Sequence, residues 1–145
     1  RMPVAAELPQ IIKQSLSIQP QEVYKARDYL LVYDKEQDIK DIEIDRQQFD
    51  KINLDPGGVI VTAKGEEYDF VSRFFTSQST ILEDPVTGSA HCSLIPFWAS
   101  RLGKEELEAM QLSDRMGKLH CQNSGDRVII GGRAKTYSIG HLWTE

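Results

Sequence analysis

Residues 83–92 read EDPVTGSAHC, and this decapeptide predicts a loop that turns directly into a helix. The proline after Asp84 breaks any preceding strand, and the small polar residues 87–89 suit a helix N-terminus. A helix start carries unpaired backbone N–H groups and the positive end of the helix dipole, which together attract anions. Gly88 would let a ligand approach the backbone closely. Because the acid Asp84 lies beside these residues, they predict a site that holds a carboxylate and moves a proton next to it.

Other segments accompany the decapeptide in a definite order along the chain. They are Leu94, Pro96, Phe97, Trp98, Leu102 and Gly103 downstream, DFVSRFF at residues 69–75 upstream, the set Gln111, Ser113, Arg115 and Gly117, and the glycine-bearing stretch 125–140. Together they resemble the phenazine-biosynthesis F (PhzF-like) family, which shares its fold with diaminopimelate epimerase. The resemblance covers residues 20–143 and is strongest from 57 to 140.

The resemblance implies an α+β fold of the diaminopimelate epimerase type, in which a curved mixed β-sheet wraps around a central buried helix. Members of the family have two similar lobes, and the active site lies in the cleft between them. A chain of 145 residues is long enough for one domain. We therefore expect residues 1–145 to form a single PhzF-like C-terminal lobe. Its lead-in strand and helix would occupy residues 1–20, and the N-terminal lobe would be absent.

The resemblance also implies a function, which is cofactor-independent isomerisation of a small carboxylate-bearing substrate by acid/base proton transfer. Asp84 would be the catalytic residue of this lobe, and Thr87, Gly88 and Ser89 would bind the substrate carboxylate. The family's catalytic glutamate would come from the missing lobe, so the isolated chain would be inactive. The expected partner is either an N-terminal lobe chain or a second copy of this chain, which would pair Asp84 with its own copy.

A role without catalysis fits the same residues. Asp84 or Thr87 would then cap the following helix, and Gly88 and Ser89 would only help to form its N-terminus. A domain that binds a small anion or a protein partner is therefore the alternative hypothesis, since an exposed half-cleft favours association.

A third hypothesis is an epimerase that uses two cysteines, and the sequence disfavours it. Cys92 lies in the apolar helix and Cys121 in a predicted strand, so both are predicted to pack in the core. In the thiol enzymes of this fold each lobe supplies one cysteine. Arg73 and Arg115 are further candidates for binding an acidic substrate. His91 is a candidate acid or base, although a histidine beside a site more often has a structural role than a catalytic one.

Composition restricts the classes of partner. The formal charge of −5 and the pI near 5.2 argue against nucleic acid and anionic membranes. The sequence has no apolar run long enough for a membrane span and no signal-peptide core, so a cytoplasmic protein is expected. The histidines and cysteines lack metal-ligand spacing, and no nucleotide-binding loop is present. We therefore expect no metal and no organic cofactor.

Hydrophobic periodicity predicts the order of helices and strands. The helix at 90–102 is apolar nearly all round, is bent by Pro96 and ends at Gly103. The other predictions are a helix at 7–16, a strand at 28–34, a polar turn at 35–38, an extended segment at 39–44, a short helix capped by Asp45, a hairpin of 59–63 with 68–75, a helical turn within 104–110, and strands at 118–122, 127–131 and 134–139.

Overall fold

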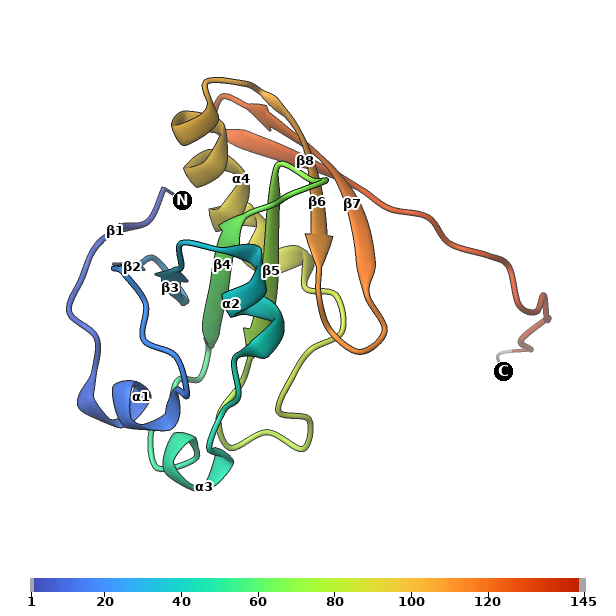
Figure 1. The fold of residues 1–145 in the computed structure, drawn as a ribbon. Helices are drawn as coiled ribbons and strands as arrows, with labels where there is room; N and C mark the ends of the chain where they lie inside the picture. The colour runs from blue at the N-terminus through green and yellow to red at the C-terminus, as the bar shows by residue number, and fades with distance from the viewer. Residues whose placement is uncertain (1, 144–145) are drawn as a thin grey trace.

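The computed structural model describes residues 2–143 and contains one mixed β-sheet with four helices in that range (Figure 1). The eight strands lie side by side in sequence order, from β1 to β8. The elements are β1 (Val4–Ala5), α1 (Gln10–Ser15), β2 (Glu22–Lys25), β3 (Tyr29–Val32), α2 (Glu36–Asp41), α3 (Arg46–Phe49), β4 (Val59–Lys64), β5 (Phe70–Phe75), α4 (Gly88–Leu102), β6 (Glu106–Gln111), β7 (Gly117–Ser124) and β8 (Arg127–Gly131).

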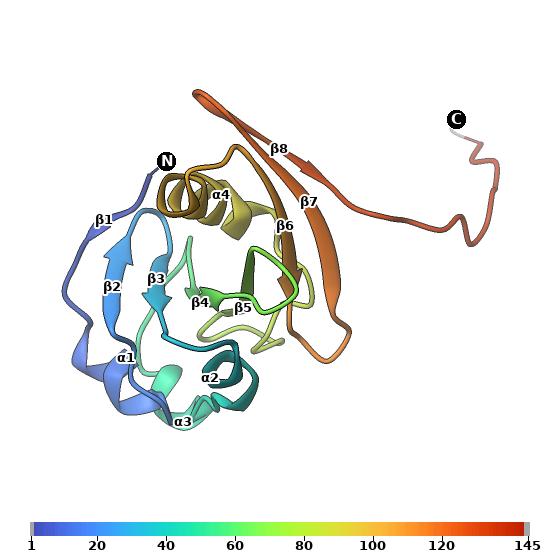
Figure 2. The same ribbon diagram turned by 45° about the horizontal axis from the view of Figure 1, so that its top comes forward.

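Two parallel pairs make the sheet mixed. β3 pairs with β4 and β5 pairs with β6 in parallel, and every other neighbouring pair is antiparallel. The helices α2 and α3 lie in the first parallel crossover, and α4 lies in the second. Figure 2 shows α4 inside the curve of the sheet, whereas α1, α2 and α3 lie outside it. The expected curved mixed sheet around a central helix is confirmed.

The alternation of side chains along the strands produces two separate cores. On the inner face, Leu30, Ile60 and Phe70 pack with Leu94 and Trp98 of α4. The intervening strand residues point outward and form a second cluster with the small helices α1, α2 and α3; it includes Ile12, Leu31, Ile39, Phe49, Val61 and Val71. Successive strand side chains point to opposite faces, so both faces of the central strands are apolar and both need a cover.

The central helix α4 is buried along most of its length but not at its start. Gly103 ends it in the left-handed conformation with φ 66°, as the sequence predicts. The indole N–H of Trp98 donates to the hydroxyl of Thr62 (3.0 Å), which ties the helix to β4. The first turn is exposed at Gly88, Ser89 and Cys92. The prediction that α4 is covered on all sides is therefore wrong for this turn.

Three predicted segments differ in the structure. Residues 36–41 form the helix α2 instead of a turn and an extended segment, since this conformation buries Ile39 in the outer cluster. A pair between Lys40 and Glu36, one turn apart (2.7 Å), adds a smaller contribution. Residues 106–111 form the strand β6 instead of a helical turn. Residues 134–139 form no strand, because the sheet ends at β8 and they have no neighbouring strand to pair with. The strand β2 was not predicted at all.

Other local predictions are confirmed. The carboxylate of Asp45 accepts hydrogen bonds from the N–H groups of Gln47 and Gln48 and so caps α3. The hairpin of β4 and β5, the strands β7 and β8, and the turn at Gly125 form where the sequence predicts them. Among residues 2–143, no helix has the length and apolar character that crossing a bilayer requires.

Candidate active site

The loop before α4 is held by hydrogen bonds from two strands. The N–H of Asp84 donates to the carbonyl of Phe74 on β5 (3.0 Å). The side chain of Gln111, at the end of β6, donates to the carbonyl of Asp84 (2.7 Å) and accepts from the N–H of Thr87 (2.8 Å). Gln111 is almost fully buried, and its amide links the two ends of the loop and so fixes the distance between them.

The segment after β6 fixes the middle of the same loop. The hydroxyl of Ser113 donates to the carbonyl of Pro85 (2.7 Å). A Cβ added to Gly117 would lie 2.4 Å from the side chain of Val86, so any larger residue there would displace Val86 of the loop. The pattern of Gln111, Ser113 and Gly117 is thus explained by three contacts with the loop.

Asp84 is oriented by Thr87. The Thr87 hydroxyl donates to Oδ2 of Asp84 (2.6 Å), and the carboxylate is partly exposed. Among the described residues no hydrogen bond is recorded to the other oxygen, Oδ1, so it is free for a ligand. Thr87 itself is only 5% exposed, and its N–H, hydroxyl and carbonyl are all engaged. The geometry therefore favours a positioning role for Thr87; its predicted contact with substrate stays a prediction.

The N-terminus of α4 has no side-chain cap. The hydroxyl of Thr87 is directed to Asp84, and within residues 2–143 no side chain accepts from the first-turn N–H groups. Gly88 and Ser89 are exposed, and a Cβ placed on Gly88 would meet nothing within 4 Å. The expectation that Asp84 or Thr87 caps the helix is wrong. The unpaired N–H groups and the dipole are left for an external anion.

Two hollows flank this helix start. One, of about 530 Å³, includes Gly88 in its wall; the other, of about 680 Å³, includes Ser89. Neither is lined by Asp84 or Thr87. Both are rich in basic side chains although the chain is acidic overall. Of the residues that the structure describes, their walls contain Lys25, Arg27, Arg115, Lys118 and Arg133, with Asp28 as the single carboxylate. The local potential therefore favours an anionic ligand.

Arg27 is a further residue at the candidate site, and no sequence pattern predicted it. Its guanidinium donates to the hydroxyl of Ser89 (3.0 Å), from a position 62 residues away in the chain. Nothing local to Arg27 distinguishes it from any other basic residue before a strand, so only the packing of β3 beside α4 brings the two together. Arg115, which was a candidate, is exposed in the wall of the first hollow.

His91 has a structural role. Its side chain is fully buried against Phe70, and its Nδ1 lies 2.8 Å from the carbonyl of Thr87. Because a carbonyl only accepts, Nδ1 carries the proton. Burial holds the pKa of His91 below its usual value, and the hydrogen bond to Thr87 opposes this only in part. The ring is therefore neutral and helps to fix the residue that orients Asp84.

Arg73 also has a structural role. Its guanidinium makes two hydrogen bonds to the carboxylate of Glu83 (both 2.8 Å) and donates to the carbonyls of Ile39 (3.1 Å) and Ile42 (2.9 Å) at the end of α2. It lies on the outer face of the sheet, so it stabilises the helix end and the start of the loop instead of meeting a ligand.

The two cysteines differ in environment. Cys121 is buried, and burial raises the pKa of its thiol to about 12. Cys92 is exposed on the first turns of α4, so the prediction that it packs in the core is wrong. The two thiols lie on β7 and α4, and the buried one is a poor nucleophile.

We expect one thiol of the native chain to react with Ellman's reagent and one to be protected. Cys92→Ser should remove the fast phase, whereas Cys121→Ser should leave it unchanged. Unfolding in guanidinium chloride should expose the second thiol and serves as the control. A fast phase that survives in Cys92→Ser would contradict the assigned environments.

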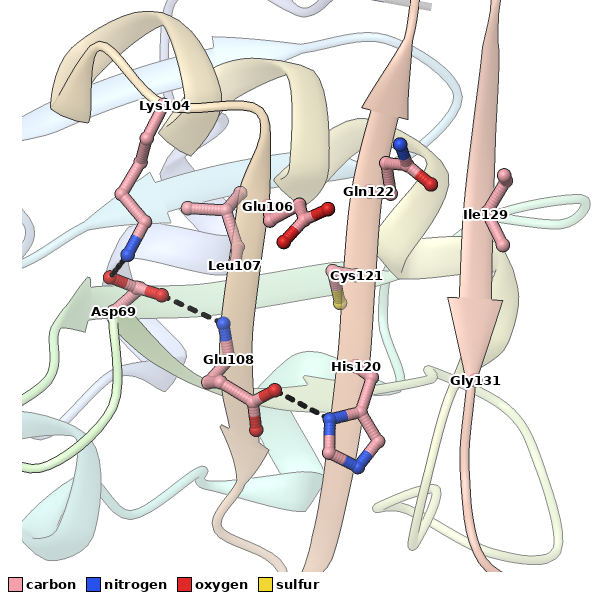
Figure 3. Close-up of a pocket in the computed structure, with 10 residues that line it drawn as sticks. All are labelled: Asp69, Lys104, Glu106, Leu107, Glu108, His120, Cys121, Gln122, Ile129 and Gly131. Carbon is pink, nitrogen blue, oxygen red and sulfur yellow. Dashed lines mark hydrogen bonds and ion pairs between the residues drawn. The ribbon is translucent and has the colours of Figure 1, made fainter.

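A third hollow, of about 540 Å³, lies over β6 and β7 (Figure 3). Most of its charged groups are paired: Lys104 contacts Asp69, and Glu108 faces His120 on the next strand. Among residues 2–143, no three histidine, cysteine or acidic side chains are grouped so that they could hold a metal ion. We assign no ligand to this hollow.

Comparison with known proteins links the loop and the fold to one family. The family model described as phenazine biosynthesis-like protein matches residues 3–140. An uncharacterised isomerase of Pseudomonas aeruginosa is 43% identical over 142 residues, which is 98% of this chain and 54% of the relative. The chain thus spans about half the length of the curated relatives it matches.

Solved structures agree in fold. The crystal structure of a PhzF-family protein from Enterococcus faecalis superposes with a TM-score of 0.87 at 40% identity, over 95% of this chain and 53% of that one. The structure of a putative PhzC/PhzF protein from Clostridium difficile gives 0.86 at 37% identity, over 99% of this chain and 55% of that one.

Proposed function

This chain belongs to the phenazine biosynthesis-like protein family, and from that premise we propose that it is one lobe of an isomerase that moves a proton on a small carboxylate substrate without a cofactor. The observation that carries the proposal is the arrangement of Asp84. Its carboxylate is oriented by Thr87 beside the uncapped start of α4, and its Oδ1 is free among the described residues. An acid and an anion site are thus held next to each other.

The roles of the residues follow from this arrangement. The substrate carboxylate accepts hydrogen bonds from the first-turn N–H groups at Gly88 and Ser89, where the helix dipole and the basic hollows favour negative charge. A proton leaves one substrate carbon and returns at another, so no electrons are gained or lost. Asp84 gives or accepts that proton, or orients the opposing acid across the cleft.

The opposing acid lies outside this chain. Among residues 2–143 no hydrogen bond joins a second carboxyl group to Asp84, and Asp28 is the single acid in the walls of the two hollows. A first lobe of the same protein is the proposed source of the second group, in keeping with relatives that are about twice as long. A second copy of this chain, which would bring its own Asp84, is the other candidate partner.

The carboxylate site can be tested on the isolated chain. We expect benzoate, titrated into ¹⁵N-labelled protein at constant ionic strength, to shift the amide signals of Gly88 and Ser89 above all others. Benzamide, which has the same shape and no charge, is the matched control and should shift them little. Equal shifts with both ligands, or benzoate-induced shifts confined to other surfaces, would contradict the proposed site.

A further inference from the structure

We propose that Arg27 is a positioning residue of this site: it turns the Ser89 hydroxyl into a hydrogen-bond donor toward the ligand and so selects a carboxylate over a neutral group. This inference rests on the proposed function, because it concerns the ligand held at the start of α4. It deepens that function by assigning a specificity to a side chain outside the loop.

Arg27 is held in a fixed orientation by Asp28. Its Nε and Nη2 lie 3.1 Å and 2.8 Å from the two carboxylate oxygens. The side chain of Asp28 is only 1% exposed and also accepts from the N–H of Gly58 (3.0 Å). A carboxylate so far removed from water needs a cation with good geometry, so the guanidinium plane is tied to the core.

The orientation of Arg27 decides what Ser89 can offer. Nη2 donates to the Ser89 oxygen (3.0 Å), and a hydroxyl has two acceptor positions and one hydrogen to donate. With one acceptor position occupied by a cation, the hydroxyl hydrogen is left to point away from Arg27. Ser89 is exposed at the helix start, so this hydrogen adds a donor to the unpaired N–H groups there.

The ion pair also presents its positive end to the ligand. The side chain of Arg27 is 47% exposed and lines the hollow beside Ser89, whereas its carboxylate partner Asp28 is buried. No hydrogen bond is recorded for Nη1 of Arg27 among the described residues, which leaves a charged donor free. A carboxylate at the start of α4 gains from this charge, and a neutral amide of the same shape does not.

The test removes the ion pair without changing net charge. In Arg27→Gln/Asp28→Asn, the amide pair avoids leaving a lone buried carboxylate, so the fold should survive. We expect the dissociation constant for benzoate, followed at Gly88 and Ser89, to rise about tenfold, while the weak benzamide response stays the same. The matched control is Arg46→Gln/Asp50→Asn, which removes another Arg–Asp pair (3.1 Å) at α3, on the outer face of the sheet.

The outcomes separate this inference from the function on which it rests. If the wild-type chain binds benzoate and the Arg27/Asp28 variant binds it equally well, the positioning role is wrong and the carboxylate site stands. If the affinities for benzoate and benzamide fall by the same factor, the ion pair has only a structural role and the inference fails. If wild-type protein shows no response at Gly88 and Ser89, the proposed site itself is overturned, together with this inference.

Discussion

Asp84→Asn, in a protein that carries both lobes, should lower turnover by about 10²- to 10⁴-fold, the range for a lost acid–base group. Asparagine has the same shape as aspartate, and its side-chain oxygen can still accept the Thr87 hydroxyl, which now donates to Oδ2 of Asp84 (2.6 Å). The loop should therefore keep its conformation. What is lost is a group that can take and return a proton.

The measurement is the incorporation of solvent deuterium into carbon-bound positions of small carboxylic acids, followed by NMR. Thermal unfolding of the variant should match the wild type, which separates loss of chemistry from loss of fold. Thr87→Val is the informative comparison, because it keeps the carboxylate and removes the hydroxyl that orients it. We expect the turnover of Thr87→Val to lie between that of the wild type and that of Asp84→Asn. Wild-type rates in Asp84→Asn would rule out the catalytic role and favour a domain that only binds an anion.

Arg73→Met should destabilise the chain by about 3–5 kcal/mol, because it breaks a largely buried ion pair and leaves one charge alone. The side chains of Arg73 and Glu83 are 15% and 20% exposed. The carbonyls of Ile39 and Ile42 would lose their donor at the same time. A cost of this size is a large fraction of the stability of an ordinary domain, about 5–15 kcal/mol.

Equilibrium denaturation in urea measures this cost. Arg73→Met/Glu83→Gln should recover part of it, since the remaining partner is no longer charged. Arg73→Lys keeps the charge but cannot make the paired contact with Glu83 and also reach both carbonyls, so an intermediate loss is expected. Glu83 directly precedes Asp84, so a change here should also loosen the loop. A cost below about 1 kcal/mol would show that the pair is screened like one on the surface.

The local chemistry of the chain predicted the elements that carry the site. The break at residues 84–85, the small residues 87–89 and the apolar run to Gly103 predicted a loop entering a central helix, and the structure has both. The hairpin of β4 and β5 was predictable for the same reason, because its alternation and turn residues lie next to each other in the sequence.

The errors fall where neighbours decide the conformation. Residues 106–111 contain good helix formers, yet they form β6 because β5 and β7 on either side supply ladder partners and Leu107 and Ala109 face the inner core. Residues 134–139 have a strand-like pattern, but no strand among residues 2–143 pairs with them. The strand or helix propensity of a segment does not depend on whether a neighbouring strand is present to pair with it.

The sequence by itself determined the family, the central helix and the identity of the acid and the glycine at its start, because these depend on residues close together in the chain. Only the tertiary structure decided how that site is held and charged. The burial of Thr87, the bridging amide of Gln111 and the contact of Arg27 with Ser89 all join segments brought together by the curvature of the sheet around α4. Packing sets such contacts between residues distant in the chain, and no local pattern of residues encodes them.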